Sequence, residues 1–163
     1  MSDESVEPET SSGQEKVAEI VHRLKALPGA LLPILHAVQD ELGYVAPSAV
    51  PVIASGLNLS RAEVHGVISF YHYFRATRPG RHTIHLCRAE ACQAMDQRTL
   101  ERHAKTRLGI DFHQTTTDGA FTFEPVYCLG NCACAPSMLV DGELYGRVTP
   151  ERFDEIAAEW ERR

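Results

Sequence analysis

The sequence of 163 residues lacks any long apolar segment of the kind that crosses a membrane. Its longest stretch without a charge lies between Glu41 and Arg61, and the Gly and Pro residues within it disfavour a spanning helix. Residues 1–15 contain no Lys or Arg and no apolar run, so they do not have the features of a secretory signal. We therefore expect a cytoplasmic protein with no direct membrane insertion.

The sequence also has no excess of basic over acidic residues. The chain has 16 Lys and Arg against 22 Asp and Glu, which gives a net charge of −6. Nucleic acids and anionic membranes attract clustered basic side chains, so we expect no nucleic-acid partner. Most of the negative charge falls in residues 1–15, which carry −5 and contain no aromatic side chain. This composition predicts a disordered acidic tail over residues 1–15.

The five cysteines include no Cys-x-x-Cys pair. This absence argues against a thioredoxin-type redox dithiol and against the tight knuckles that usually bind structural zinc. Disulfides are rare in the cytoplasm, so closely spaced thiols in this sequence favour a metal or cluster site. The sequence also has no phosphate loop, no glycine-rich nucleotide fingerprint and no Ser/His/Asp order, and we expect no catalytic residue in this chain.

Residues 16–80 have a helical pattern. Apolar side chains recur at helical spacing in four segments, which span residues 17–24, 31–42, 48–55 and 60–71. Gly43 is a predicted C-terminal cap of the second segment, and Ser60 with Glu63 has the spacing of a capping box at the start of the fourth. We therefore predict a helical N-terminal domain, made of four short helices.

The periodicity changes after residue 80, and residues 81–163 are predicted to mix strands and helices. The predicted elements are a strand at 81–87, a helix at 91–108, a strand at 121–126, a hairpin at 137–145 and a last helix from Thr149-Pro150. Asp141-Gly142 is a strong two-residue turn signal within the hairpin, and Met95 is expected to point inward from the first helix. The whole chain is therefore predicted to be an α+β protein.

Four of the cysteines form two pairs that follow predicted strands. Cys87 and Cys92 have four residues between them, and Cys128 and Cys132 have three. Two neighbouring strands would bring these pairs together at one edge of a sheet. The loop after Cys128 consists of small or unbranched residues, which allow the backbone to approach the sulfurs closely.

The spacing alone leaves three interpretations open. A [2Fe–2S] cluster has two irons that each need two ligands, and intervals such as Cys-x4-Cys suit it. A zinc-stabilised scaffold module and unliganded structural or redox thiols are the alternatives. A Rieske centre is rejected, because it needs histidines close to the cysteines and none follows the second pair.

Several motifs resemble one family of proteins. The motifs are Cys87-x4-Cys92, CLGNCACAP from residue 128, MLVDGELYGRVTPERFDEI from residue 138, LLPILHAVQDELGYV from residue 31, LNLSRAEVHGVISFYHYF from residue 57 and PGRHTIHLC from residue 79. Together they resemble the thioredoxin-like [2Fe–2S] subunits of NADH-linked dehydrogenases, in respiratory complex I and its soluble relatives, over roughly residues 16–160.

This resemblance implies a four-helix N-terminal segment followed by a thioredoxin-like [2Fe–2S] ferredoxin domain over residues 81–163. By position, Cys87, Cys92, Cys128 and Cys132 match the cluster ligands of that family. Cys134 falls at a variable apolar position and is expected to be a non-ligand. The chain would then be a non-catalytic electron-transfer subunit of an NAD-dependent oxidoreductase.

The segment CRAEACQ at residues 87–93 is most similar to the gamma subunit of soluble NAD-dependent formate dehydrogenases. That resemblance implies a beta-type partner subunit that binds FMN and NAD. It also implies a larger partner subunit with further Fe–S clusters and a molybdenum cofactor. Equivalent subunits of complex I or of an NAD-reducing hydrogenase are the alternatives.

Overall fold

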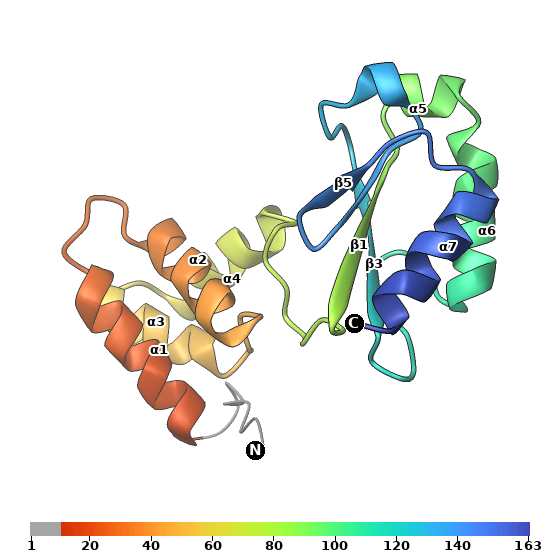
Figure 1. Ribbon diagram of the computed structural model, residues 1–163. Helices are drawn as coiled ribbons and strands as arrows, with labels where there is room; N and C mark the ends of the chain where they lie inside the picture. The colour runs from red at the N-terminus through yellow and green to blue at the C-terminus, as the bar shows by residue number, and fades with distance from the viewer. Residues whose placement is uncertain (1–10) are drawn as a thin grey trace. The chain divides into compact units, whose positions relative to one another are not determined.

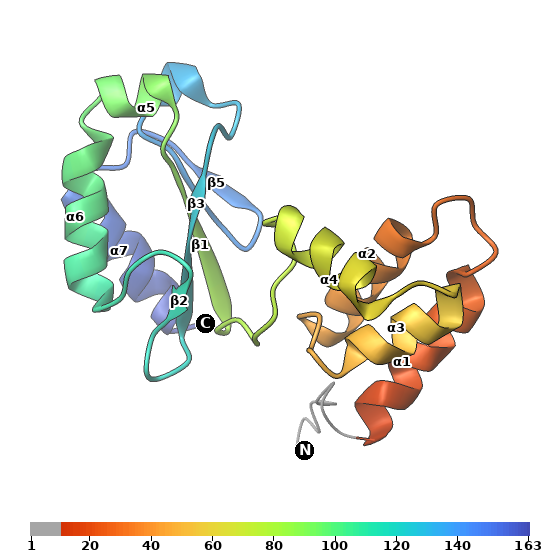
Figure 2. The same cartoon turned by 180° about the vertical axis from the view of Figure 1, so that it is seen from behind.

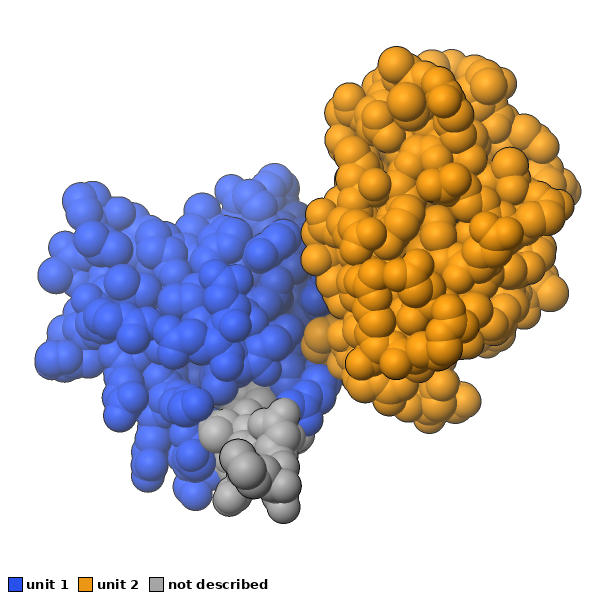
Figure 3. Space-filling view, in the orientation of Figure 1, with its two compact units in different colours: residues 1–78 blue, residues 79–163 orange. Residues whose placement is uncertain are grey.

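The computed structural model describes residues 11–163, which are shown as ribbons in Figures 1 and 2. The chain divides into two compact units, residues 1–78 and residues 79–163 (Figure 3), and the division lies close to the predicted boundary after residue 80. Within the described residues, no helix is both long enough and apolar enough to cross a membrane.

The first ten residues of the predicted acidic tail lie outside the described part of the chain. Residues 11–15, which we placed in that tail, are instead helical, because α1 spans Ser11–Leu24. Nucleation is the costly step of helix formation, so a helix held by the buried side chains of Val17 and Ile20 extends towards its N-terminus at little further cost.

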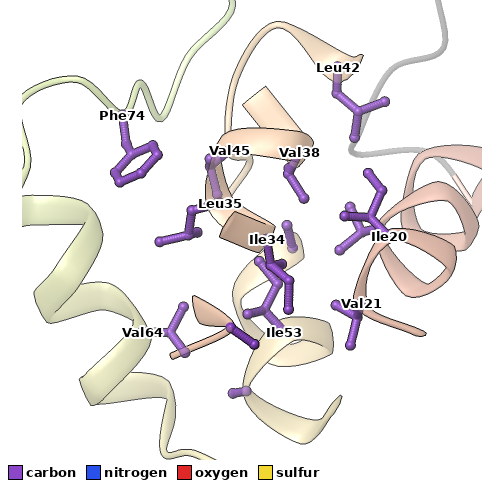
Figure 4. Close-up of a cluster of buried hydrophobic side chains, with 14 residues drawn as sticks. Ile20, Val21, Ile34, Leu35, Val38, Leu42, Val45, Ile53, Val64 and Phe74 are labelled. Atoms are coloured by element: carbon purple, nitrogen blue, oxygen red, sulfur yellow. The ribbon is translucent and has the colours of Figure 1, made fainter. Parts of the chain in front are cut away.

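The first unit contains the four helices that the sequence predicts. They are α1, α2 (Leu31–Leu42), α3 (Ala49–Leu57) and α4 (Arg61–Phe70). α1 packs against α2 and α3, and α3 packs against α4. Ile34, Leu35 and Val38 of α2 are fully buried in the core that these helices share (Figure 4). The unit is therefore built around the apolar face of α2.

The predicted helix ends are confirmed in this unit. Gly43 follows α2 with a φ of 86°, and its N–H donates to the carbonyl of Gln39. The Ser60 Oγ accepts a hydrogen bond from the Glu63 N–H at 3.2 Å, and the Ser60 N–H donates to the Glu63 carboxylate at 2.8 Å. These reciprocal bonds satisfy two backbone groups that would otherwise lack helical partners.

Replacing Ser60 with Ala is expected to lower the free energy of unfolding by about 1 kcal/mol, because α4 loses the acceptor that caps its first turn. Denaturant unfolding of the full chain measures the change. Ser69→Ala is the matched control, since the Ser69 hydroxyl only donates to carbonyls of its own helix. Equal losses in both variants would contradict a capping role for Ser60.

The second unit is a five-stranded sheet with helices packed on it. Its strands are β1 (His82–Cys87), β2 (Gln114–Thr115), β3 (Phe121–Val126), β4 (Met138–Val140) and β5 (Glu143–Tyr145), in the order β2-β3-β1-β4-β5. β1 and β3 are parallel, and the other neighbours are antiparallel. The sheet is therefore mixed, with its parallel pair at the centre.

Three helices belong to this unit: α5 (Glu90–Ala94), α6 (Gln97–Leu108) and α7 (Pro150–Glu161). α6 and α7 lie side by side along the sheet (Figures 1 and 2). The buried Phe123 of β3, Leu100 of α6 and Phe153 of α7 belong to one core cluster. The Thr149 Oγ accepts a hydrogen bond from the Arg152 N–H at 3.2 Å, which confirms the predicted cap of α7.

Two predictions for this unit were wrong in detail. The helix predicted at 91–108 is divided into α5 and α6 at Asp96, whose φ of 61° cannot continue a right-handed helix. Met95 lies at this break and is 59% exposed, so it does not point into the core. The strand β2 was not predicted, because a strand of two residues is too short to show an alternating pattern.

The hairpin prediction is confirmed. Asp141 and Gly142 join β4 to β5 and have φ values of 45° and 92°, the two positive angles that a tight type I′ turn requires. The Asp141 carboxylate also accepts a hydrogen bond from the Thr83 N–H at 2.8 Å. The turn is therefore held by its own backbone geometry and by the first residues of β1.

Candidate metal centre

The parallel pairing of β1 and β3 places the two cysteine segments at one end of the sheet. Cys87, the last residue of β1, pairs with Val126, the last residue of β3, and Cys128 follows two residues later. Both views show α5, which carries Cys92, at the same end of the unit as the 3₁₀ turn Cys132–Cys134 (Figures 1 and 2). The fold thus gathers all five cysteines at the carboxyl ends of β1 and β3.

The cysteines differ in burial. Cys87 and Cys92 are each 2% exposed and form a small apolar cluster with Ala135. Cys128 and Cys132 are exposed, and their Sγ atoms lie 3.8 Å apart. One pair is therefore shielded by protein while the other faces outward.

The backbone turns sharply around Cys128. Its φ is 117°, in a region that residues with a side chain rarely adopt. The N–H of Gly130 donates to the Cys128 sulfur at 3.3 Å. A backbone N–H aimed at a sulfur stabilises negative charge on it, as the environments of bound thiolates do. Strain of this kind is often stored where the chain must present a functional group.

The thiols perturb each other electrostatically. The pKa of the Cys92 thiol is raised to about 11, chiefly by burial and then by the adjacent Cys87 thiol. The pKa of Cys132 is also raised, chiefly by its hydrogen bond with Cys128. Metal ions bind the thiolate form, so a bound cation would offset the repulsion that disfavours ionising neighbouring thiols.

The donor set fits a two-iron cluster. Within residues 11–163, no group of three or more His, Cys, Asp or Glu side chains is arranged so that it could hold a metal ion. A [2Fe–2S] cluster has a different requirement, because each of its two irons takes two protein ligands. The two cysteine pairs supply four thiols from two segments, which matches that requirement.

Arg88 follows Cys87 directly and shares an acidic partner with Lys105. Its Nε lies 3.1 Å from a carboxylate oxygen of Glu101, and Lys105 Nζ lies 2.8 Å from the other oxygen. The Arg88 guanidinium also lies over the Phe112 ring, 5.2 Å from its centroid. Arg88 and Lys105 thus form one ion-pair group with Glu101 and Asp111, in α6 and the loop that follows.

Two polar residues of this region, Asn131 and Ser137, were not predicted from the sequence. Ser137 is 1% exposed, and its Oγ lies 3.2 Å from the side-chain nitrogen of Asn131. Asn131 lies in the loop between Cys128 and Cys132, and a Gly/Asn turn signal marks that loop in the sequence. No sequence signal marks Ser137. Its side-chain partners lie three and six residues before it, at Cys134 and Asn131, and only the Cys87 N–H that donates to its carbonyl comes from another segment.

Comparison with known proteins identifies the family. The family described as thioredoxin-like [2Fe–2S] ferredoxin matches residues 17–161. The HndA subunit of the NADP-reducing hydrogenase of Solidesulfovibrio fructosivorans is 33% identical over 145 residues, which cover 87% of this chain and 85% of that subunit. A subunit of the NADH-quinone oxidoreductase of Pseudomonas aeruginosa is 34% identical over 131 residues, which cover 80% of this chain and 79% of that protein.

A solved structure has the same fold. A chain of an NAD⁺-reducing [NiFe]-hydrogenase superposes with a TM-score of 0.69 at 25% sequence identity, over 86% of this chain. This chain spans only 24% of the hydrogenase chain that it matches. The helical first unit and the mixed-sheet second unit therefore agree with the predicted fold class, and the family supports a [2Fe–2S] cluster as the cofactor. The chain belongs to the thioredoxin-like [2Fe–2S] ferredoxin family.

Proposed function

We propose that this chain is an electron-transfer subunit of an NAD-dependent oxidoreductase. Its cofactor would be one [2Fe–2S] cluster, ligated by Cys87, Cys92, Cys128 and Cys132. The observation that carries the proposal is the convergence of these four thiols at the carboxyl ends of β1 and β3. When bound, such a cluster accepts and donates single electrons, at about −400 mV for the all-cysteine type.

The residues around the thiols suit this role. The buried pair, Cys87 and Cys92, lies among apolar side chains that exclude water from one side of the site. The exposed pair, Cys128 and Cys132, leaves the other side open to a partner. A one-electron carrier needs both features, since protein holds the cluster on one side and the redox partner approaches from the other.

We further propose that the oxidoreductase is a soluble NAD-dependent formate dehydrogenase. The support is the segment of residues 87–93, which resembles the gamma subunit of those enzymes. The partners would be a subunit that binds FMN and NAD and a larger subunit with a molybdenum cofactor and further Fe–S clusters. Both relatives described above belong to other oxidoreductases, a hydrogenase and an NADH-quinone oxidoreductase.

Purification of the full chain without oxygen tests the cofactor. We expect a coloured protein with two irons and two sulfides per chain, which gains an electron paramagnetic resonance signal on one-electron reduction. A colourless chain that contains stoichiometric zinc would instead support the zinc-stabilised scaffold module and overturn the cluster proposal.

Isolation of the native complex through a tag on this chain tests the partners. We expect a flavoprotein subunit and a molybdenum-containing subunit to co-purify, and we expect the complex to reduce NAD⁺ with formate. Activity with hydrogen or with a quinone in place of formate would assign the chain to one of the other two classes. Recovery of the tagged chain alone would contradict the subunit role.

A further inference from the structure

Ser137 contacts all three segments that carry the cysteines. Its carbonyl oxygen accepts a hydrogen bond from the Cys87 N–H at 3.1 Å. Its backbone also acts on the Cys92 thiol, where it opposes the rise in the pKa of that thiol. Its Oγ lies 3.2 Å from the Asn131 side-chain nitrogen and 3.3 Å from the Cys134 carbonyl oxygen. This residue is thus bonded to the end of β1 and to the loop that holds Cys128 and Cys132, and it acts electrostatically on Cys92 of α5.

The Ser137 hydroxyl is enclosed. The residue is 1% exposed, so its Oγ must find its partners inside the protein. The Asn131 side-chain N–H donates to it, and the carbonyls of Asn131 and Cys134 lie within reach as acceptors at 3.4 Å and 3.3 Å. The Arg147 N–H donates to the Cys134 carbonyl at 2.6 Å. The loop that carries the exposed cysteines is therefore fixed on its inner side by a small buried network.

We propose that Ser137 is a positioning residue for the cluster, whose hydroxyl, bonded to Asn131, fixes the Cys128–Cys132 loop relative to Cys87 and Cys92. The proposal rests on the function proposed above, because positioning has meaning only if these thiols share a cofactor. It assigns a role to a side chain that is not itself a ligand. Groups that orient metal ligands commonly change metal affinity by 10–100-fold when they are removed.

Loss of the Ser137 hydroxyl is expected to affect the exposed cysteine pair more than the buried pair. Without the hydroxyl, the backbone contacts of Ser137 to Cys87 and Cys92 remain, while its side-chain link to the other loop is lost. The buried pair should then keep its geometry and the exposed pair should loosen. We therefore expect a cluster that still assembles but has altered iron–sulfur geometry on one side.

Two variants of the full chain test this inference. Ser137→Ala removes the hydroxyl. Asn131→Ala removes the side-chain donor to that hydroxyl, at a half-buried position that tolerates truncation better. After reconstitution with iron and sulfide, we expect each variant to lose its cluster to a chelator roughly 10–100-fold faster than the parent chain. We also expect shifted g values in the reduced state, which a purely structural role would leave unchanged.

A variant with both Ser137→Ala and Asn131→Ala tests whether the two side chains act through one hydrogen bond. If the two side chains act through one hydrogen bond, the effect of both substitutions is smaller than the sum of the two single effects. Thr106→Ala is the control, because its hydroxyl donates only to the Arg102 carbonyl of its own helix. We expect Thr106→Ala to have parental spectra and parental rates of cluster loss.

Three results would overturn the inference. They are parental g values in both single variants, rates of cluster loss equal to the Thr106→Ala rate, or strictly additive effects in the double variant. Failure of the proposed function is distinguishable, since the unsubstituted chain itself would then bind no iron and sulfide. If Ser137→Ala does not fold, Asn131→Ala tests the same bond.

Discussion

A Cys132→Ser variant is expected to lose most of its visible absorption and bound iron, whereas a Cys134→Ser variant keeps both. The Cys132 Sγ lies 3.8 Å from that of Cys128, and the pKa of Cys132 is raised chiefly by that neighbour. A serine hydroxyl ionises far less readily than a thiol, so it is a poor replacement for a thiolate ligand. The loss removes one of four ligands and leaves the cluster incompletely held.

Cys134 is only two residues away and has different surroundings. Its N–H donates to the Asn131 carbonyl at 3.0 Å, and its carbonyl accepts from the Arg147 N–H at 2.6 Å. Its Cβ lies beside Gly146, where an added methyl would approach it to 2.8 Å. These contacts are backbone and packing contacts, so an oxygen in place of the Cys134 sulfur should change little.

The Cys132→Ser and Cys134→Ser variants are compared by their iron and sulfide content. Visible absorption and electron paramagnetic resonance complete the comparison. The two substitutions are chemically identical and lie in one 3₁₀ turn, so each serves as the control for the other. The reverse result, with the cluster lost in Cys134→Ser and kept in Cys132→Ser, would move the fourth ligand to Cys134. Retention in both variants would contradict the proposed ligand set.

Features set by local chemistry could be predicted from the sequence. The capping box of Ser60 and Glu63, the cap at Thr149 and the Asp141-Gly142 turn each depend on a few adjacent residues, and the structure confirms all three. The division of one predicted helix at Asp96 could not be predicted. The left-handed conformation of Asp96 has no glycine to signal it.

The candidate metal centre could also be predicted only in part. Cysteine spacing and the predicted strands indicated that two loops would meet at one sheet edge. The parallel pairing that brings them together is a property of the sheet order, which alternating residues do not encode. The hydrogen bond from the Cys87 N–H to the Ser137 carbonyl depends on tertiary structure in the same way, because the two residues are far apart in the sequence. The positive φ of Cys128 has no glycine at that position to signal it.

Gly146→Ala is expected to lower the free energy of unfolding of the second unit by about 1–3 kcal/mol and to reduce cluster occupancy. A Cβ at this position would lie 2.7 Å from the Asn131 side-chain nitrogen and 2.9 Å from the Cys134 carbonyl oxygen. Real Cβ atoms do not approach so closely, and the carbonyl is backbone that cannot rotate away. The methyl must therefore displace the loop that carries Cys132.

Gly66→Ala adds the same methyl group where nothing lies within 4 Å, in the middle of α4. Alanine is favoured over glycine inside a helix by about 0.5–1 kcal/mol, so this control should be slightly more stable than the parent chain. Denaturant unfolding and iron content of both variants separate the two effects. The chemical change is identical in the two variants. Opposite signs of the change in the free energy of unfolding would therefore show that the loss in Gly146→Ala comes from crowding at the loop. Equal stability and full iron content in both variants would show that the loop can move aside, and that its position is not fixed by contact with Gly146.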